Sequence, residues 1–269
     1  MKKVMKIIGI ILLAAVVLCF AVLKILGSRP AAPKDYQKKV QTGGAIEAKY
    51  MANDACEVSK HEDACLLEFG KFIVYYPAEL ETSNKKYSVI VLCNGSGTPL
   101  SKYPAVAQHY ASWGFVVIGT EEKNAWNAFG AEMSLRYLER MNENEQIEDK
   151  QSIFYQKIDF DNVGIVGHSQ GGVGVINAIT DTKHSSTYKT AVALSPTNKE
   201  LAHNLFWDYD ATKIKIPIML ISGAGGGDDW VVTGEQLQGD EEAGKAFTGD
   251  SPEIMNNPLY QDQMADIQG

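Results

Sequence analysis

Short apolar runs alternate with amphipathic stretches along the chain, starting near residue 66. Six runs have the length and the β-branched or aromatic composition of strands: Leu66–Tyr76, Tyr87–Cys93, Phe115–Gly119, Val163–Val166, Ala191–Leu194 and Ile216–Ile221. Three stretches between them place apolar side chains at helical spacing: 104–113, 129–141 and 172–180. Strands and helices that alternate in this way predict a mostly parallel sheet with helices on both faces. Sites in such sheets lie at the carboxyl ends of the strands.

The N-terminus carries a longer apolar run of a different kind. Every residue from Ile7 to Leu23 is apolar or glycine, three lysines precede this run and Lys24 follows it. An apolar run of this length with basic residues on its N-terminal side predicts a signal anchor over residues 1–27. This segment would form one membrane helix and leave the rest of the chain extracytoplasmic. The alternative is a secreted protein whose signal peptide is cleaved.

Prolines and glycines mark the residues that follow as a linker over 28–45. The remaining residues, 46–269, are numerous enough for one large domain with its own core. Cys56 and Cys65 lie in a short polar stretch near its start, where an exported protein could join them as a disulfide, although spacing alone leaves this open. Cys93 ends an apolar run and is expected to be a buried thiol.

The charge distribution limits the classes of partner. The formal net charge is −8, but the first 29 residues hold five basic residues and no acidic one. The remainder therefore carries 20 basic and 33 acidic residues, a net charge of −13. Such an acidic body argues against nucleic acid as a partner, because phosphate binding needs a basic surface. No cysteine and histidine have the spacing of zinc ligands, so no metal site is expected.

The strongest chemical signal is the sequence VGIVGHSQGG at 163–172, where an apolar strand leads into G-x-S-x-G and then directly into a helix. Ser169 needs small neighbours two positions away on either side if it is to sit on a sharp strand-to-helix turn with its hydroxyl exposed. The start of the helix adds a positive partial charge. This pattern predicts a serine nucleophile, against the plainer reading of a glycine-rich turn. His168 is too close in sequence to serve as the base, and a structural role is expected for it.

A second motif follows the strand Tyr87–Cys93. Residues 93–98 read CNGSGT and directly follow a strand. Enzymes with a serine nucleophile on a strand-to-helix turn place one donor for the developing oxyanion at such a position. We predict that the backbone amides of Ser96 and Gln170 form this oxyanion site. The alternative is an ordinary turn, which the sequence NGSG also suits.

The acidic partner of a catalytic histidine is expected after a later strand. The run Ile216–Ile221 leads into SGAGGGDDW, which contains two adjacent carboxylates. We predict Asp228 as the catalytic acid, with Asp229 as the alternative. Either residue could instead cap the helix that follows.

Together these motifs resemble the α/β-hydrolase superfamily, and within it secreted esterases and lipases akin to cutinase-type polyester hydrolases and chlorophyllase-like lipases. The resemblance covers about residues 66–232 and is carried by NGSGT, ASWGFVVIGT at 111–120, GHSQGG and the strand leading to Asp228. It implies that residues 46–269 form an α/β-hydrolase domain. It also implies a carboxylic-ester hydrolase without a cofactor that forms an acyl-enzyme on Ser169. The ester could be a small molecule, a lipid or a polymer, and neither its binding residues nor the oligomeric state can be read from the sequence.

One feature departs from this family pattern, in which the serine, the acid and the histidine follow one another along the chain. All five histidines precede Asp228: His61, His109, His168, His184 and His203. We therefore expect the hydrolase domain to be incomplete at its C-terminus, and the chain as written to be nearly inactive for lack of its base. The alternatives are His203 as an unusual base, or a non-catalytic, membrane-tethered protein that uses the hydrolase fold for binding.

Overall fold

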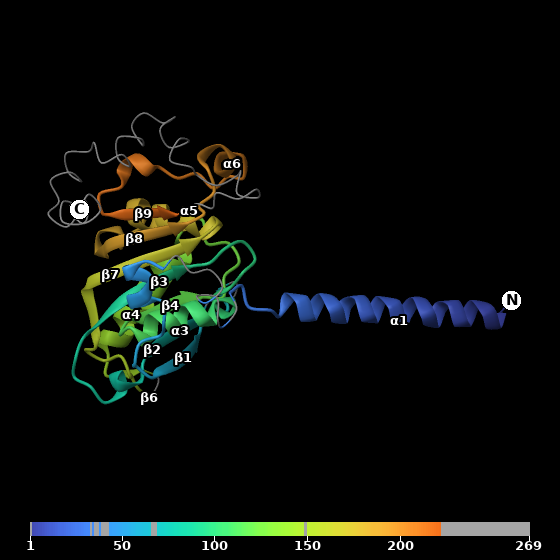
Figure 1. Cartoon of the computed structure of the whole chain (residues 1–269), viewed down its shortest axis with the longest axis horizontal. Coiled ribbons are helices and arrows are strands. Elements are labelled where there is room, and N and C mark those ends of the chain that lie inside the picture. The colour runs from blue at the N-terminus through green and yellow to red at the C-terminus, as the bar shows by residue number, and fades with distance from the viewer. Residues whose placement is uncertain are drawn as a thin grey trace.

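The computed structural model of the chain describes residues 2–32, 34, 38, 43–65, 69–147 and 150–221. Its seven main strands are β1 (Val58–Ala64), β2 (Lys71–Pro77), β3 (Tyr87–Cys93), β4 (Val116–Thr120), β7 (Ile158–His168), β8 (Tyr188–Leu194) and β9 (Ile218–Ile221). They form one sheet in the order β1-β2-β4-β3-β7-β8-β9 (Figure 1). The pairs β1–β2 and β2–β4 are antiparallel, and every other neighbouring pair is parallel. The predicted mostly parallel sheet is therefore confirmed.

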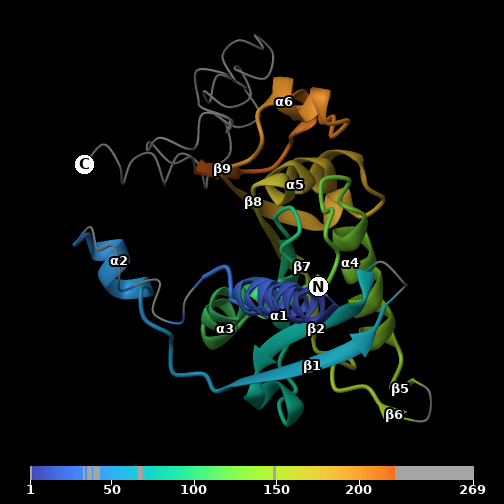
Figure 2. The same ribbon diagram turned by 90° about the vertical axis from the view of Figure 1, so that its right-hand side faces the viewer.

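Helices cover both faces of this sheet, as predicted (Figure 2). On one face lies α3 (Pro104–Ser112); on the other lie α4 (Phe129–Glu143) and α5 (Gln170–Asp181). Strand β3 serves both cores, because Val89 and Val91 pack with α4 and α5, whereas Ile90 and Leu92 pack with α3. Successive side chains of a strand point to opposite faces. A strand between two helical layers therefore needs a continuous apolar run.

Some elements differ from the prediction. Strand β1 was not expected; its polar sequence pairs only with β2, at the edge of the sheet, and most of its side chains are exposed or half-buried. Strand β7 begins at Ile158, well before the predicted Val163, and its pairing with β3 shifts register between Ser88 and Val89. Two short strands, β5 (Gln146–Ile147) and β6 (Lys150–Gln151), were not expected either, and they pair antiparallel as a separate small sheet.

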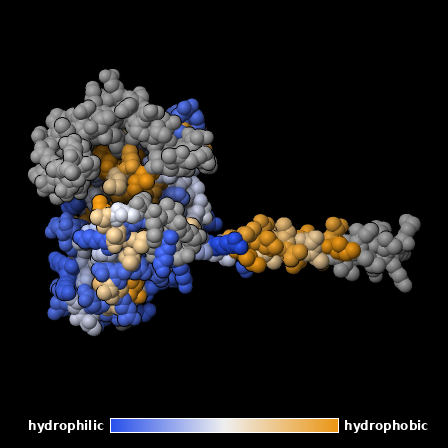
Figure 3. Space-filling model, in the orientation of Figure 1, coloured by the Kyte–Doolittle hydropathy of each residue, from blue (hydrophilic) through white to orange (hydrophobic). Residues whose placement is uncertain are grey.

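The N-terminal apolar segment forms α1 (Lys2–Gly27), which projects away from the domain (Figure 1) with exposed apolar side chains such as Phe20 (Figure 3). Among the residues that the structure describes, however, no helix has the length and apolar character needed to cross a membrane. The predicted membrane helix is thus not supported.

The chain after α1 runs back onto the domain. The backbone amide of Ala31 donates to the carbonyl oxygen of Lys102 at 2.7 Å, in the 3-10 turn η4 (Leu100–Lys102) that precedes α3. The remaining short elements are α2 (Ala45–Tyr50), α6 (Lys199–Asn204), η3 (Ala78–Glu81), η5 (Ser185–Thr187) and η6 (Ala211–Lys213). The division into anchor, linker and hydrolase domain stays a prediction.

Candidate active site

Ser169 lies at the sharp turn between β7 and α5, with φ 57° and ψ −122°. A residue with a Cβ atom rarely adopts positive φ, so the surrounding structure must hold this backbone conformation in place. The backbone amide of Ser169 donates to the carbonyl oxygen of Leu194 at 2.8 Å, and its own carbonyl oxygen accepts from the amide of Gly172 at 2.8 Å. The half-buried side chain thereby stands at the carboxyl end of β7 and the start of α5.

The two glycines of the motif are required by close backbone contacts. A Cβ atom on Gly167 would clash with the carbonyl group of Gly171, and a Cβ atom on Gly171 would clash with the carbonyl groups of Cys93 and Asn94. The turn can therefore close against the end of β3 only because both positions lack a side chain. The expected need for small residues two positions from Ser169 therefore has its cause in these backbone contacts.

The second motif lies directly beside this turn. Parallel pairing sets Cys93 opposite Gly167, so the residues that follow β3 and β7 emerge next to each other. Gly95 packs against His168, since a Cβ atom there would lie 3.0 Å from the ring nitrogen Nδ1. Gly95 and Thr98 form an isolated bridge that exposes Ser96 at the tip. The structure thus brings the segments of Ser96 and Gln170 to the same end of adjacent strands.

The two motifs also contain two buried amide side chains whose contacts were not predicted from the sequence. Asn94 and Gln170 are each 1% exposed. The Nδ2 of Asn94 donates to the carbonyl oxygens of Thr120 at 2.7 Å and Glu122 at 3.2 Å, and Oε1 of Gln170 accepts from the amide of Ala125 at 3.1 Å. The position of Asn94 directly after a buried strand could have indicated this role, because a buried amide side chain needs hydrogen-bond partners.

An apolar pocket of about 220 Å³ opens beside this turn. Leu92, Val106, Val166 and Leu194 line it, Ala31 and Ala32 from the segment after α1 contribute one wall, and Tyr103 and His168 give it a polar edge. The Tyr103 hydroxyl accepts from the amide of Gly95 at 3.3 Å and lies 3.3 Å from Nδ1 of His168. Burial raises the pKa of Tyr103, so its phenol stays neutral at physiological pH.

A strand-to-helix turn with a strained serine, next to a glycine-rich turn at the sheet's carboxyl edge, is the arrangement of an α/β-hydrolase site. A family model described as PET hydrolase-like matches residues 41–231. The chain belongs to the PET hydrolase-like family. This is a cutinase-type polyester hydrolase family within the α/β-hydrolase superfamily, which confirms the resemblance and supports hydrolysis of esters. No curated protein matches the chain.

The histidines of this PET hydrolase-like protein have side-chain partners other than Ser169: Nδ1 of His168 lies 3.3 Å from the Tyr103 hydroxyl, and Nδ1 of His109 lies 3.1 Å from Oδ1 of Asn53. His184 contacts Glu132 and Glu139, whereas His203 pairs with Asp208, its Nδ1 lying 2.8 Å from Oδ1. The predicted acid Asp228 and its alternative Asp229 lie outside the described residues. The roles assigned to Ser169, Asp228, Ser96 and Gln170 therefore stay predictions.

The structure of this PET hydrolase-like protein contains no disulfide between Cys56 and Cys65. Cys93 is 5% exposed, as expected for a buried thiol, and burial raises its pKa well above the usual range. Within the described part of the chain, no group of three or more His, Cys, Asp or Glu side chains is arranged to hold a metal ion.

Proposed function

We propose that this chain is a serine carboxylic-ester hydrolase that forms an acyl-enzyme on Ser169. The observation that carries the proposal is the backbone of Ser169, held at positive φ between β7 and α5. Backbone strain of this kind gathers at functional sites, and a nucleophile lifted clear of the strand accounts for it at the centre of a G-x-S-x-G motif. Membership of a polyester hydrolase family supports the ester as the bond that is attacked.

In the proposed reaction, Oγ of Ser169 attacks the ester carbonyl carbon and the alcohol leaves. The backbone amides of Ser96 and Gln170 stabilise the oxyanion, and water then releases the acid from the acyl-enzyme. Attack requires a base that removes the serine proton and passes it to the oxygen of the departing alcohol. We assign that base to none of His109, His184 and His203, whose ring nitrogens lie beside Asn53, Glu132 and Asp208. Asp228 is the proposed acid and Asp229 its alternative.

The apolar pocket supports an ester with a compact apolar group. A dry cavity of about 150 Å³ suffices to bind benzene, and the pocket measures about 220 Å³. An aromatic ring or a short acyl chain therefore fits in this pocket, whose lining includes Gly167 and His168 of the turn, with the rest of the ester at the polar edge formed by Tyr103 and His168. A polyester, the substrate class of the family, also presents apolar units next to its ester groups.

We also propose that the domain acts outside the cytoplasm. The support is the N-terminal charge pattern, with three lysines before a long apolar run. N-terminal sequencing of the protein recovered from the exported fraction distinguishes a retained segment from a cleaved one. Recovery of the protein only from the cytoplasm would contradict this placement.

A fluorophosphonate probe tests the nucleophile directly, because it reacts covalently with an activated serine and spares an ordinary one. Labelling of the chain is expected to be slow, because no base is assigned, and it should be lost in Ser169→Ala. Ser195→Ala is the matched control: this serine also has positive φ, 45°, and follows the neighbouring strand β8. It should label like the wild type. Undiminished labelling of Ser169→Ala would refute the nucleophile.

The alternative is a non-catalytic binding protein with the hydrolase fold. One observation favours it, namely that His109, His184 and His203 lie beside Asn53, Glu132 and Asp208. Hydrolysis of 4-nitrophenyl acetate by the wild type, lost in Ser169→Ala, would exclude it. Binding of an ester without labelling or hydrolysis would establish it.

A further inference from the structure

We propose that the side chains of Asn94 and Gln170 are positioning residues that fix both oxyanion donors to one shared loop, residues 120–125. This inference rests on the proposed function, in which the donors are the backbone amides of Ser96 and Gln170. The two donors belong to segments 74 positions apart in the chain (96 and 170), so their relative position depends on contacts between the segments. We call the set of hydrogen bonds from Asn94, Gly97 and Gln170 to loop 120–125 the amide clamp.

Asn94 forms the first arm of the amide clamp. Its Nδ2 donates to two carbonyl oxygens at the end of β4, those of Thr120 and Glu122. Only a side chain with two N–H donors can satisfy both acceptors at once, whereas an aspartate in the same place would oppose them with negative charge. The amide of Gly97 adds a third bond, to the carbonyl oxygen of Lys123 at 3.0 Å. Ser96 is thus flanked on both sides by residues bonded to the same loop.

Gln170 forms the second arm. Its side-chain Oε1 accepts from the amide of Ala125, while its own backbone amide is the proposed donor. Helix α5 and the loop also touch backbone to backbone, since a Cβ atom on Gly174 would clash with the carbonyl oxygen of Ala125. Loop 120–125 therefore contacts both segments that carry a donor.

Packing alone does not account for these two side chains. Within the described residues, Nε2 of Gln170 and Oδ1 of Asn94 are buried without a hydrogen-bond partner. A buried polar atom left unpaired costs free energy that an apolar side chain of similar size avoids. What the amides supply, and methionine or leucine would not, is the set of bonds to loop 120–125.

The clamp matters for catalysis because oxyanion donors act by being in place before charge develops. A misplacement of about 1 Å at a reacting group can cost about 100-fold in rate. Loosening one arm should therefore lower kcat by about 10- to 100-fold. The KM should change less than kcat, since Asn94 alone among the three clamp residues lines the pocket.

The experiment compares Asn94→Ala and Gln170→Met in the full chain. Ser134→Ala is the matched control, because it removes a buried hydrogen bond of 2.8 Å, from Ser134 Oγ to the carbonyl oxygen of Gly130, within α4. Two readouts are taken: kcat and KM for 4-nitrophenyl acetate, and hydrogen exchange of the amides in 94–98 and 120–125. Either clamp variant should lower kcat and speed exchange in both segments. The control should do neither.

A fall in kcat no larger than that of Ser134→Ala, or faster exchange confined to the mutated segment, would overturn the amide clamp. A wild type that neither labels with fluorophosphonate nor hydrolyses the ester would instead refute the proposed function. In that case the exchange data alone decide whether the two segments are coupled through the loop.

Discussion

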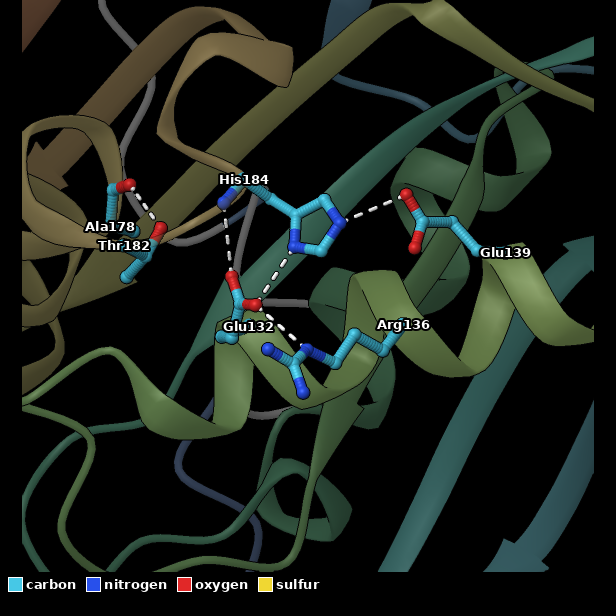
Figure 4. A network of polar contacts seen from close by, with 6 residues as sticks. All are labelled: Glu132, Arg136, Glu139, Ala178, Thr182 and His184. Carbon is cyan, nitrogen blue, oxygen red and sulfur yellow. Dashed lines mark hydrogen bonds and ion pairs between the residues drawn. The ribbon is translucent and has the colours of Figure 1, made fainter.

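Nδ1 of His184 lies 2.9 Å from Oε1 of Glu132 (Figure 4). The other ring nitrogen, Nε2, lies 2.9 Å from Oε1 of Glu139, and the backbone amide of His184 donates to Oε2 of Glu132 at 3.1 Å. Both ring nitrogens of His184 thus face carboxylate oxygens of α4. His184 therefore ties the segment after α5 to α4 through polar contacts with two glutamates, and α5 is the helix that begins beside Ser169.

Replacing His184 by alanine should destabilise the protein by about 2 kcal/mol. The reason is burial: the side chain of Glu132 is 9% exposed and would keep Arg136 as its remaining side-chain partner. Urea denaturation at neutral pH measures the loss. His203→Ala is the matched control, because the side chains of His203 and Asp208 are 76% and 69% exposed. That pair should contribute less than about 1 kcal/mol. Equal losses in the two variants would contradict the role of burial.

The same cluster predicts a dependence of stability on pH. Burial alone would raise the pKa of Glu132, but the hydrogen bonds from His184 and Arg136 outweigh it and lower the pKa from 4.5. A carboxyl group with a lowered folded pKa stabilises the fold above its unfolded pKa, and the contribution disappears as the pH falls through the folded value. Glu132→Gln should therefore flatten the loss of stability on acidification below about pH 5.

Unfolding free energies measured across this pH range check the expectation. Glu145→Gln is the control, because the Glu145 side chain is exposed and the glutamate contributes only its backbone carbonyl, which accepts from the amide of Ser152. Its profile should follow the wild type. Parallel profiles for Glu132→Gln and the wild type would show that this carboxyl group contributes nothing to the acid response.

The sequence predicted those parts of the fold that are buried, because burial requires an apolar composition. In β3, Val89 and Ile90 face opposite helical layers, so the strand appears in the sequence as an apolar run without polar interruption. Strand β1 leaves no such mark. Its sequence, VSKHEDA, is held by pairing with β2, and an edge strand needs neither an apolar run nor strict alternation.

The candidate site divides in the same way. The turn at Ser169 could be located because the glycines it needs, Gly167 and Gly171, are two positions away in sequence. The amide clamp could not, since the partners of Asn94 lie 26 and 28 residues away and meet it only through the pairing of β3 with β4. Asp228 falls outside the described residues and stays a prediction.

The contact between Gly171 and the end of β3 gives a stringent test of the turn. In Gly171→Ala the new methyl group would meet the backbone carbonyls of Cys93 and Asn94, which cannot move without shifting the segment that carries Ser96. We expect a destabilisation of more than about 2 kcal/mol in urea denaturation, together with loss of fluorophosphonate labelling. The two effects share one cause, because the same backbone contact sets the turn and the proposed oxyanion site.

Gly164→Ala separates this contact from a general effect of losing a glycine. Gly164 lies in the same strand, β7, but a Cβ atom there would lie 3.4 Å from Cγ2 of Thr190, an ordinary van der Waals separation. Its stability should change by less than about 1 kcal/mol, with labelling unaffected. If Gly171→Ala instead folds and labels like Gly164→Ala, then β3 and the turn at Ser169 are not held by direct backbone contact. The position of the serine would then have to depend on its hydrogen bonds to Leu194 and Gly172 alone.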